Sequence, residues 1–131
     1  MTMKLSPDHL PGFKSQFTAT KVGRRNWVVA QDLVYVSGLP GFDLHICVPV
    51  GFKTDLASIP RMFWWIVPPD GSYTPAAVVH DYLYRHPITD RATADRIFIE
   101  AMKHCGTWKI VRGGIYATVR AFGWMFFKGR K

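Results

Sequence analysis

Cysteine is scarce in this sequence of 131 residues, which contains only Cys47 and Cys105. Two cysteines exclude a small secreted scaffold held together by several disulfides. The pair forms either one bridge or, as we expect, two buried thiols of a protein made in the reducing cytosol.

Acidic residues are also few. Nine Asp and Glu stand against 17 Lys and Arg, which gives a formal net charge of +8. This balance favours polyanionic partners, either nucleic acid or an anionic membrane surface. The basic residues are scattered and no zinc-finger, helix-turn-helix or RNP signature is present, so a nucleic-acid-binding protein ranks third among the functions considered.

Long hydrophobic runs are missing as well. No apolar run reaches the ~18 residues that a membrane-spanning helix needs, and no signal-peptide pattern opens the chain. With 48% apolar residues and no repeat, low-complexity tract or linker, the chain is nevertheless expected to fold as a single domain over 1–131.

Local patterns predict an α+β fold, with a small N-terminal antiparallel β-sheet followed by three helices. β-branched and aromatic runs separated by turn residues indicate strands near 24–30, 33–37 and 42–49. The expected parts are an N-terminal arm or short strand (1–20), the sheet (21–52), a loop (53–73) and the helical part (74–131).

The first two helices have clear boundaries. Thr74 is a capping residue, Pro75 suits the first helical position, and the helix is expected to run to Arg85. The second helix covers 91–102, with Thr89 or Asp90 as its cap and Gly106 beyond its end. Their apolar stripes are Ala76, Val79, His80 and Leu83 in the first, and Asp95, Phe98, Ile99 and Met102 in the second.

Each of these stripes carries one ionisable residue, His80 in the first and Asp95 in the second. A buried imidazole or carboxylate needs polar partners. Two antiparallel helices that face each other satisfy both, so we predict a hydrogen bond of roughly 2.6–3.2 Å between His80 and Asp95.

The third helix, from Trp108 to about Phe127, allows two interpretations. Its stripe is typical of core packing, while its basic residues and aromatic end also fit a helix lying at an anionic membrane surface. The stripe residues are Trp108, Val111, Ile115, Val119, Phe122 and Phe126.

A histidine oriented by a carboxylate is half of a catalytic triad, and no Ser or Cys lies in a nucleophile context, so water is the expected nucleophile. Tyr84, one turn after His80, completes the candidate catalytic group. Asp55 and Asp81 are oxygen ligands suited to calcium, which would stabilise an oxyanion. In the structural alternative Asp81 pairs with Arg85 and Asp55 caps its loop.

The segment His80-Asp-Tyr-Leu-Tyr-Arg85 resembles the His-Asp-x-x-Tyr helix of secreted and bacterial phospholipases A that cleave the sn-2 ester. In that family the His is the general base for water, the next Asp binds calcium, and an Asp on the partner helix orients the His. The resemblance implies these roles for His80, Asp81 and Asp95, and places Asp55 in an upstream calcium loop. The sequence lacks that family's disulfide set and its Cys-Gly-x-Gly loop.

A longer resemblance covers roughly residues 25–123. Val48-Pro-x-Gly-Phe-x-Thr-Asp-Leu-Ala-Ser-Ile-Pro-Arg61, Ala77-x-x-His-Asp-Tyr-Leu-Tyr-Arg85 and Ala94-Asp-Arg-x-Phe98 are similar to a family found mainly in tailed bacteriophages and prophages, domain of unknown function 1353. This resemblance implies a phage origin and no particular activity.

The combined expectation is a metal-assisted hydrolase of the bacterial envelope, acting on phospholipid ester first and peptidoglycan second. The alternative is a non-enzymatic virion or tail-associated protein that contacts other virion proteins. Either would be made in the host cytoplasm and then act at the envelope or join the virion.

Overall fold

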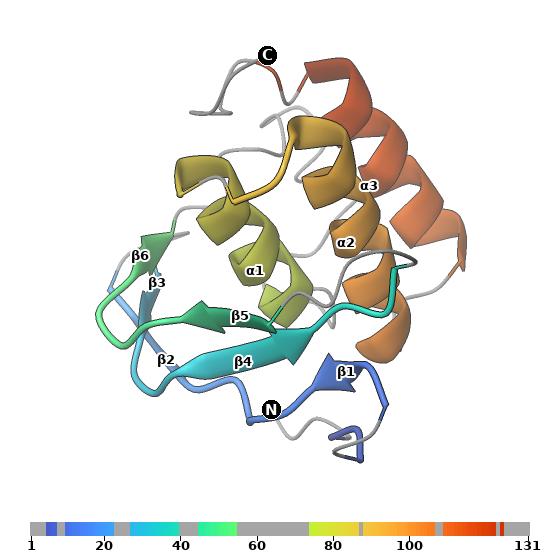
Figure 1. The fold of residues 1–131 in the computed structure, drawn as a ribbon. Helices are drawn as coiled ribbons and strands as arrows, with labels where there is room; N and C mark the ends of the chain where they lie inside the picture. Colours follow the sequence, from blue (N-terminus) through green and yellow to red (C-terminus); the bar gives the residue numbers. More distant parts are fainter. Residues whose placement is uncertain are drawn as a thin grey trace.

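The α+β class is confirmed by a computed structural model, which describes residues 5–7, 10–22, 27–39, 45–54, 74–86, 88–106, 109–122 and 124. Short strands come first in the chain and helices follow (Figure 1). The strands are β1 (Gly12–Phe13), β2 (Ala19–Lys21), β3 (Trp27–Val29), β4 (Leu33–Val36), β5 (His45–Val48) and β6 (Lys53–Thr54). The helices are α1 (Thr74–Arg85), α2 (Arg91–His104) and α3 (Lys109–Phe122).

The strands form two antiparallel sheets where the sequence predicted one. Their orders are β1-β4-β5 and β2-β3-β6. β1 and most of β2 lie within the predicted N-terminal arm, and β6 lies within the predicted loop. Strands of two or three residues are too short to show an alternating pattern, and their pairing depends on residues distant in the sequence.

The paired strands β4 and β5 form one side of the hydrophobic core. In β4 Leu33 and Tyr35 are buried, and they pair in register with Val48 and Ile46 of β5, which are buried too. The alternation leaves Cys47 exposed, while Cys105 is half-buried and both thiols are free. The expectation of two buried thiols was therefore wrong for Cys47, because it lies on the solvent face of a half-buried strand.

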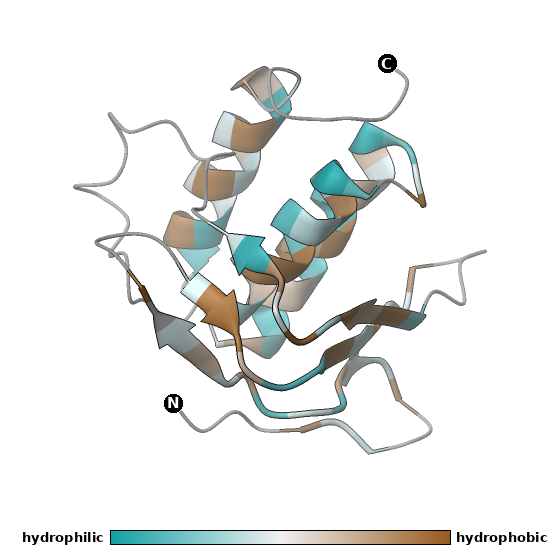
Figure 2. Cartoon of the chain, turned by 90° about the vertical axis from the view of Figure 1, so that its left-hand side faces the viewer, coloured by the Kyte–Doolittle hydropathy of each residue, from teal (hydrophilic) through white to brown (hydrophobic). Residues whose placement is uncertain are grey.

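The three helices pack side by side above the sheets, with α2 between α1 and α3 (Figure 1). Hydrophilic and hydrophobic residues alternate along the helices, the amphipathic pattern that the sequence predicts (Figure 2). A hydrogen bond of 2.6 Å from the buried Tyr35 hydroxyl to Glu100 ties β4 to α2, and Glu100 also accepts from the Gly38 N–H at 2.9 Å.

The boundaries of α1 are as predicted, and α2 ends near its predicted stop. Asp90 is the N-cap residue of α2, although its side chain makes no capping hydrogen bond to the backbone. Cys105 is the C-cap, and Gly106 follows with φ 77°. A positive φ suits glycine because a side chain would clash there.

Within the described residues the third helix spans Lys109–Phe122 and only partly matches its expected stripe. Ile115 and Val119 are buried, but Phe122, in the last turn, is 43% exposed. Trp108 and Phe126 lie outside the described residues. None of the described helices combines the length and apolar content needed to cross a bilayer.

Candidate functional site

The candidate site is built on α1, which lies between the sheets and α2. Ten of the twelve residues of this helix are buried, among them the whole predicted stripe. His80 is completely buried, and its ring stacks on Phe98 of α2 with centroids 4.3 Å apart. This apolar packing already restricts the orientation of the imidazole ring, independently of its polar contacts.

The predicted His–Asp pair is confirmed. His80 Nε2 lies 2.7 Å from Asp95 Oδ1, and both side chains have no exposed surface. The Asp95 carboxylate also accepts hydrogen bonds from the Tyr84 hydroxyl and the Arg120 guanidinium, so Nε2 is assigned as the donor in the His–Asp pair. In that tautomer of a neutral imidazole, Nδ1 is the hydrogen-bond acceptor.

Tyr84 also converges on this carboxylate. Its hydroxyl donates to Asp95 Oδ1 at 2.5 Å, and its ring lies 4.1 Å from that of His80. Burial, followed by the hydrogen bond to Asp95, raises the pKa of Tyr84 well above its ordinary value. The hydroxyl therefore stays protonated and serves as a donor that positions Asp95.

Two arginines hold the other carboxylate oxygen, and sequence reasoning assigned neither to the site. Arg120 of α3 donates to Asp95 Oδ2 at 2.8 Å, and Arg91 of α2 lies 3.5 Å from the same oxygen. The i, i+4 spacing of Arg91 and Asp95 was the available signal for the first. No local signal connects Arg120 to Asp95, because the contact depends on how α3 packs.

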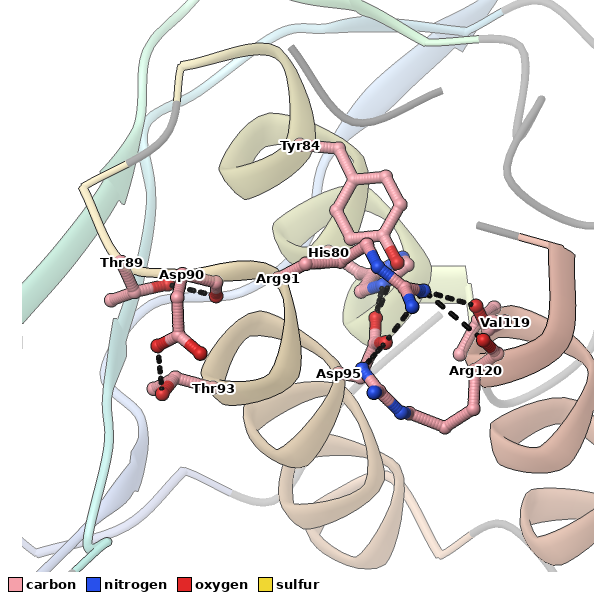
Figure 3. A network of polar contacts seen from close by, with 9 residues as sticks. All are labelled: His80, Tyr84, Thr89, Asp90, Arg91, Thr93, Asp95, Val119 and Arg120. Atoms are coloured by element: carbon pink, nitrogen blue, oxygen red, sulfur yellow. Dashed lines mark hydrogen bonds and ion pairs between the residues drawn. The ribbon is translucent and has the colours of Figure 1, made fainter. Parts of the chain in front are cut away.

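Arg91 also joins α2 to the backbone of α3. Arg91 donates to the carbonyl oxygens of Val119 and Arg120 at 3.0 and 3.2 Å, near the end of α3 (Figure 3). One carboxylate thus has donors from all three helices: His80 and Tyr84 from α1, Arg91 from α2, and Arg120 from α3.

Asp81, the predicted metal ligand, lies on the neighbouring side of α1 and has other partners. One carboxylate oxygen accepts from the Thr54 hydroxyl of β6, and the other lies 3.4 Å from Arg85 Nε. Arg85 also donates to the Lys53 carbonyl at 2.7 Å. The Asp81–Arg85 pair is the contact that the structural alternative predicted.

The second predicted ligand, Asp55, lies outside the described residues. Within the described part of the chain, no group of three or more His, Cys, Asp or Glu side chains is placed to hold a metal. Asp81 offers one carboxylate, which is paired with a guanidinium, whereas a calcium ion takes six to eight oxygen ligands. The calcium site of Asp55 and Asp81 stays a prediction.

Comparison with known proteins places this site in a family. The family described as "Protein of unknown function (DUF1353)" matches residues 27–119. The chain belongs to this family. The uncharacterized protein y4jT of Sinorhizobium fredii (strain NBRC 101917 / NGR234) is 35% identical over 80 residues, which cover 58% of this chain and 23% of that protein. The chain thus spans about a quarter of the length of this curated relative. No solved structure matches this chain.

The DUF1353 segment contains most of the site. His80, Tyr84, Arg91 and Asp95 all lie inside residues 27–119, whereas Arg120 is the first residue after them. The arginine that attaches α3 to the carboxylate therefore lies at the very edge of the segment matched by the family.

Proposed function

We propose that this DUF1353 protein is a hydrolase in which His80 acts as the general base toward water. The observation that carries the proposal is the buried His80–Asp95 hydrogen bond of 2.7 Å, with Tyr84 on the same carboxylate oxygen. A hydrogen bond donated by Nε2 favours the tautomer in which Nδ1 is the acceptor, and in this proposal Nδ1 takes the proton from water. A positioned base of this kind accelerates a reaction by about 10²–10⁴-fold.

The charges around Asp95 support the same role. When His80 takes a proton from water, the imidazolium is stabilised by the carboxylate 2.7 Å away. Arg91 and Arg120 hold Asp95 Oδ2, so the carboxylate keeps its orientation while Oδ1 serves the histidine. Tyr84 restricts Oδ1 further. The network acts on the base by positioning it.

The proposed substrates belong to the bacterial envelope, with phospholipid ester first and peptidoglycan second. The likeness of His80-Asp-x-x-Tyr84 to the phospholipase A helix supports the ester, and the net charge of +8 supports an anionic surface. We also propose a phage or prophage context, which rests on the resemblance of residues 25–123 to a family found mainly in tailed bacteriophages. No step through a metal is included, since Asp81 is already paired with Arg85.

A second candidate is a non-enzymatic role as a virion or tail component. Two observations favour it. His80 and Asp95 are both completely buried, and the Asp95 carboxylate is a cross-link among three helices. A satisfied polar network of this kind contributes to a unique packing without any chemistry.

Hydrolysis assays separate the two candidates. Wild type and His80→Ala are incubated with vesicles of phosphatidylglycerol and, separately, with purified peptidoglycan, and released fatty acid or soluble fragments are measured. We expect wild type to be active on the vesicles and His80→Ala to lose at least about 100-fold.

The matched control is His86→Ala, because His86 is exposed and lies just after the same helix. It should retain wild-type activity, and circular dichroism should show both variants folded. If wild type releases nothing from either substrate, or folded His80→Ala remains active, the hydrolase proposal is wrong and the structural role is favoured.

A further inference from the structure

The outer face of α3 is unusual for a surface helix because it is almost free of charge. The buried residues of this helix are Ile115, Thr118 and Val119, and its exposed residues lie before, between and after them in the sequence. Apart from Lys109, the exposed residues in this part of the chain are Ile110, Gly113, Gly114, Ala117, Ala121, Phe122 and Trp124.

Three of these side chains are large and strongly exposed. Ile110 is 87% exposed, Trp124 52% and Phe122 43%. At 100° per residue, Ile110, Ala117 and Ala121 fall within one sector of the surface of α3, and the exposed Trp124 follows just beyond the end of this helix. Together they form an apolar strip that starts at the first turn and extends past the last one. We call these four residues the outer strip.

The neighbouring helix provides a comparison within the same chain. The exposed positions of α2 are Arg96, Lys103 and His104, which are ordinary residues for contact with water. The two helices pack side by side and both have exposed residues. Exposure to solvent alone therefore does not explain why the exposed residues of α2 are polar and most of those of α3 are apolar. A large exposed apolar patch generally marks a binding surface.

The charge around the outer strip indicates which kind of partner it fits. Glu100 is the last acidic residue of the chain, while residues 101–131 contain seven Lys and Arg. Lys109 and Arg120 flank the strip along one edge, and the aromatic segment at its end is followed by three more basic residues in the sequence. An apolar strip bordered by basic residues is the pattern of a helix that lies in an anionic lipid interface.

We propose that the outer strip of α3 binds the surface of an anionic lipid bilayer, with the helix axis parallel to the membrane plane. Ile110 and Trp124 enter the interface at either end, and the small residues between them let the helix backbone approach the lipid. Because Arg120 and Arg91 connect the end of α3 to Asp95, the His80–Asp95 pair lies on the inner side of the helix whose outer side binds the membrane. The binding does not depend on the hydrolase activity proposed above.

Vesicle flotation with the full chain tests the proposal. Vesicles of phosphatidylcholine are compared with vesicles that also contain phosphatidylglycerol. We expect binding at least about tenfold stronger to the anionic vesicles, and weaker binding as salt rises from ~0.1 to ~0.5 M. Ala117→Glu and Ile110→Glu place a carboxylate in the strip and should each reduce binding about tenfold or more.

Val50→Glu is the matched control, since Val50 is 58% exposed in the turn between β5 and β6, away from α3 (Figure 1). It adds the same charge and should bind as the wild type does. His80→Asn should also bind normally, which separates membrane binding from hydrolysis. Melting curves establish that each variant is folded.

Three results would overturn the proposal. The first is no difference between the two kinds of vesicle, and the second is an equal loss in Val50→Glu and Ala117→Glu. The third is a dimer in solution that Ala117→Glu dissociates while no vesicles bind. That result would show that a second copy of the chain covers the strip.

Discussion

Arg120 Nη1 lies 2.8 Å from Asp95 Oδ2, and this contact joins α3 to the carboxylate that orients His80. Asp95 is completely buried, whereas the Arg120 side chain is 37% exposed. The interaction with Asp95 is the main cause that raises the pKa of Arg120. The negative charge of the buried Asp95 carboxylate is thus compensated by Arg120, a partly exposed residue of another helix.

Removal of this arginine should weaken the whole helical part. In Arg120→Met the carboxylate retains His80, Tyr84 and the more distant Arg91, so the loss is that of one charge-assisted hydrogen bond. We expect the free energy of unfolding to fall by about 1–2 kcal/mol, at the low end of the usual range because Arg120 is partly screened by solvent. Urea denaturation measures the change.

Arg96→Met is the control for this variant, because Arg96 is exposed on α2. A change at such a surface position is usually within about 0.5 kcal/mol. Equal losses in the two variants would mean that Arg120 contributes nothing specific to Asp95.

The pair could be predicted from the sequence, but its surroundings could not. His80 and Asp95 each interrupt an apolar stripe at helical spacing, and two adjacent helices with such stripes have to face each other. Arg120 gives no comparable signal. It lies 25 residues after Asp95, on a helix whose packing angle the sequence does not specify.

The sheets were harder to predict for a related reason. β4 and β5 each have four residues and a visible alternation, so their region was located correctly. β1 and β6 have two residues each, and their partners β4 and β3 are determined by long-range pairing. Such strands exist only because the tertiary fold brings a partner strand to them.

The two cysteines should differ in reactivity. Cys47 is exposed on β5, whereas burial raises the pKa of the Cys105 thiol to about 12. Since the thiolate is the reactive form, a disulfide reagent at pH 8 should modify Cys47 readily and Cys105 only slowly. The measurement is the number of fast-reacting thiols in wild type, Cys47→Ser and Cys105→Ala. Two fast thiols in the wild type would contradict the burial of Cys105.

The raised pKa of the Cys105 thiol also predicts how the stability of the protein changes at alkaline pH. The folded state holds the Cys105 proton more tightly than the unfolded state, because its pKa is raised from 9.0 to about 12. This contribution to stability is complete below pH 9 and is lost as the pH rises through that interval. The melting temperature of Cys105→Ala should therefore fall less than that of the wild type between pH 8 and pH 11.

Calcium should leave the melting temperature of the wild type unchanged. A calcium ion at Asp81 would have to displace Arg85, which lies 3.4 Å from one carboxylate oxygen, and also the Thr54 hydroxyl on the other. Melting curves with EDTA, calcium, magnesium and zinc measure the effect. An increase of several degrees with calcium, absent in Asp81→Asn, would instead establish Asp81 as a metal ligand.

The two central glycines of α3 give the last prediction. A Cβ added at Gly113 or Gly114 would meet no atom within 4 Å, and neither residue has a positive φ. Nothing within the described fold requires glycine at these positions, although each glycine weakens a helix by roughly 0.5–1 kcal/mol relative to alanine. Gly113→Ala and Gly114→Ala should therefore each increase the free energy of unfolding by about that amount.

Gly106→Ala is the matched control, because it too has open space around it but a φ of +77°. An alanine there adopts the left-handed region, which costs about 1–2 kcal/mol, so this variant should be less stable. Urea denaturation of the three variants should give opposite signs for α3 and for the end of α2. If the α3 variants are destabilised as well, their glycines have a packing role inside the folded chain, because solvent contact alone would permit alanine.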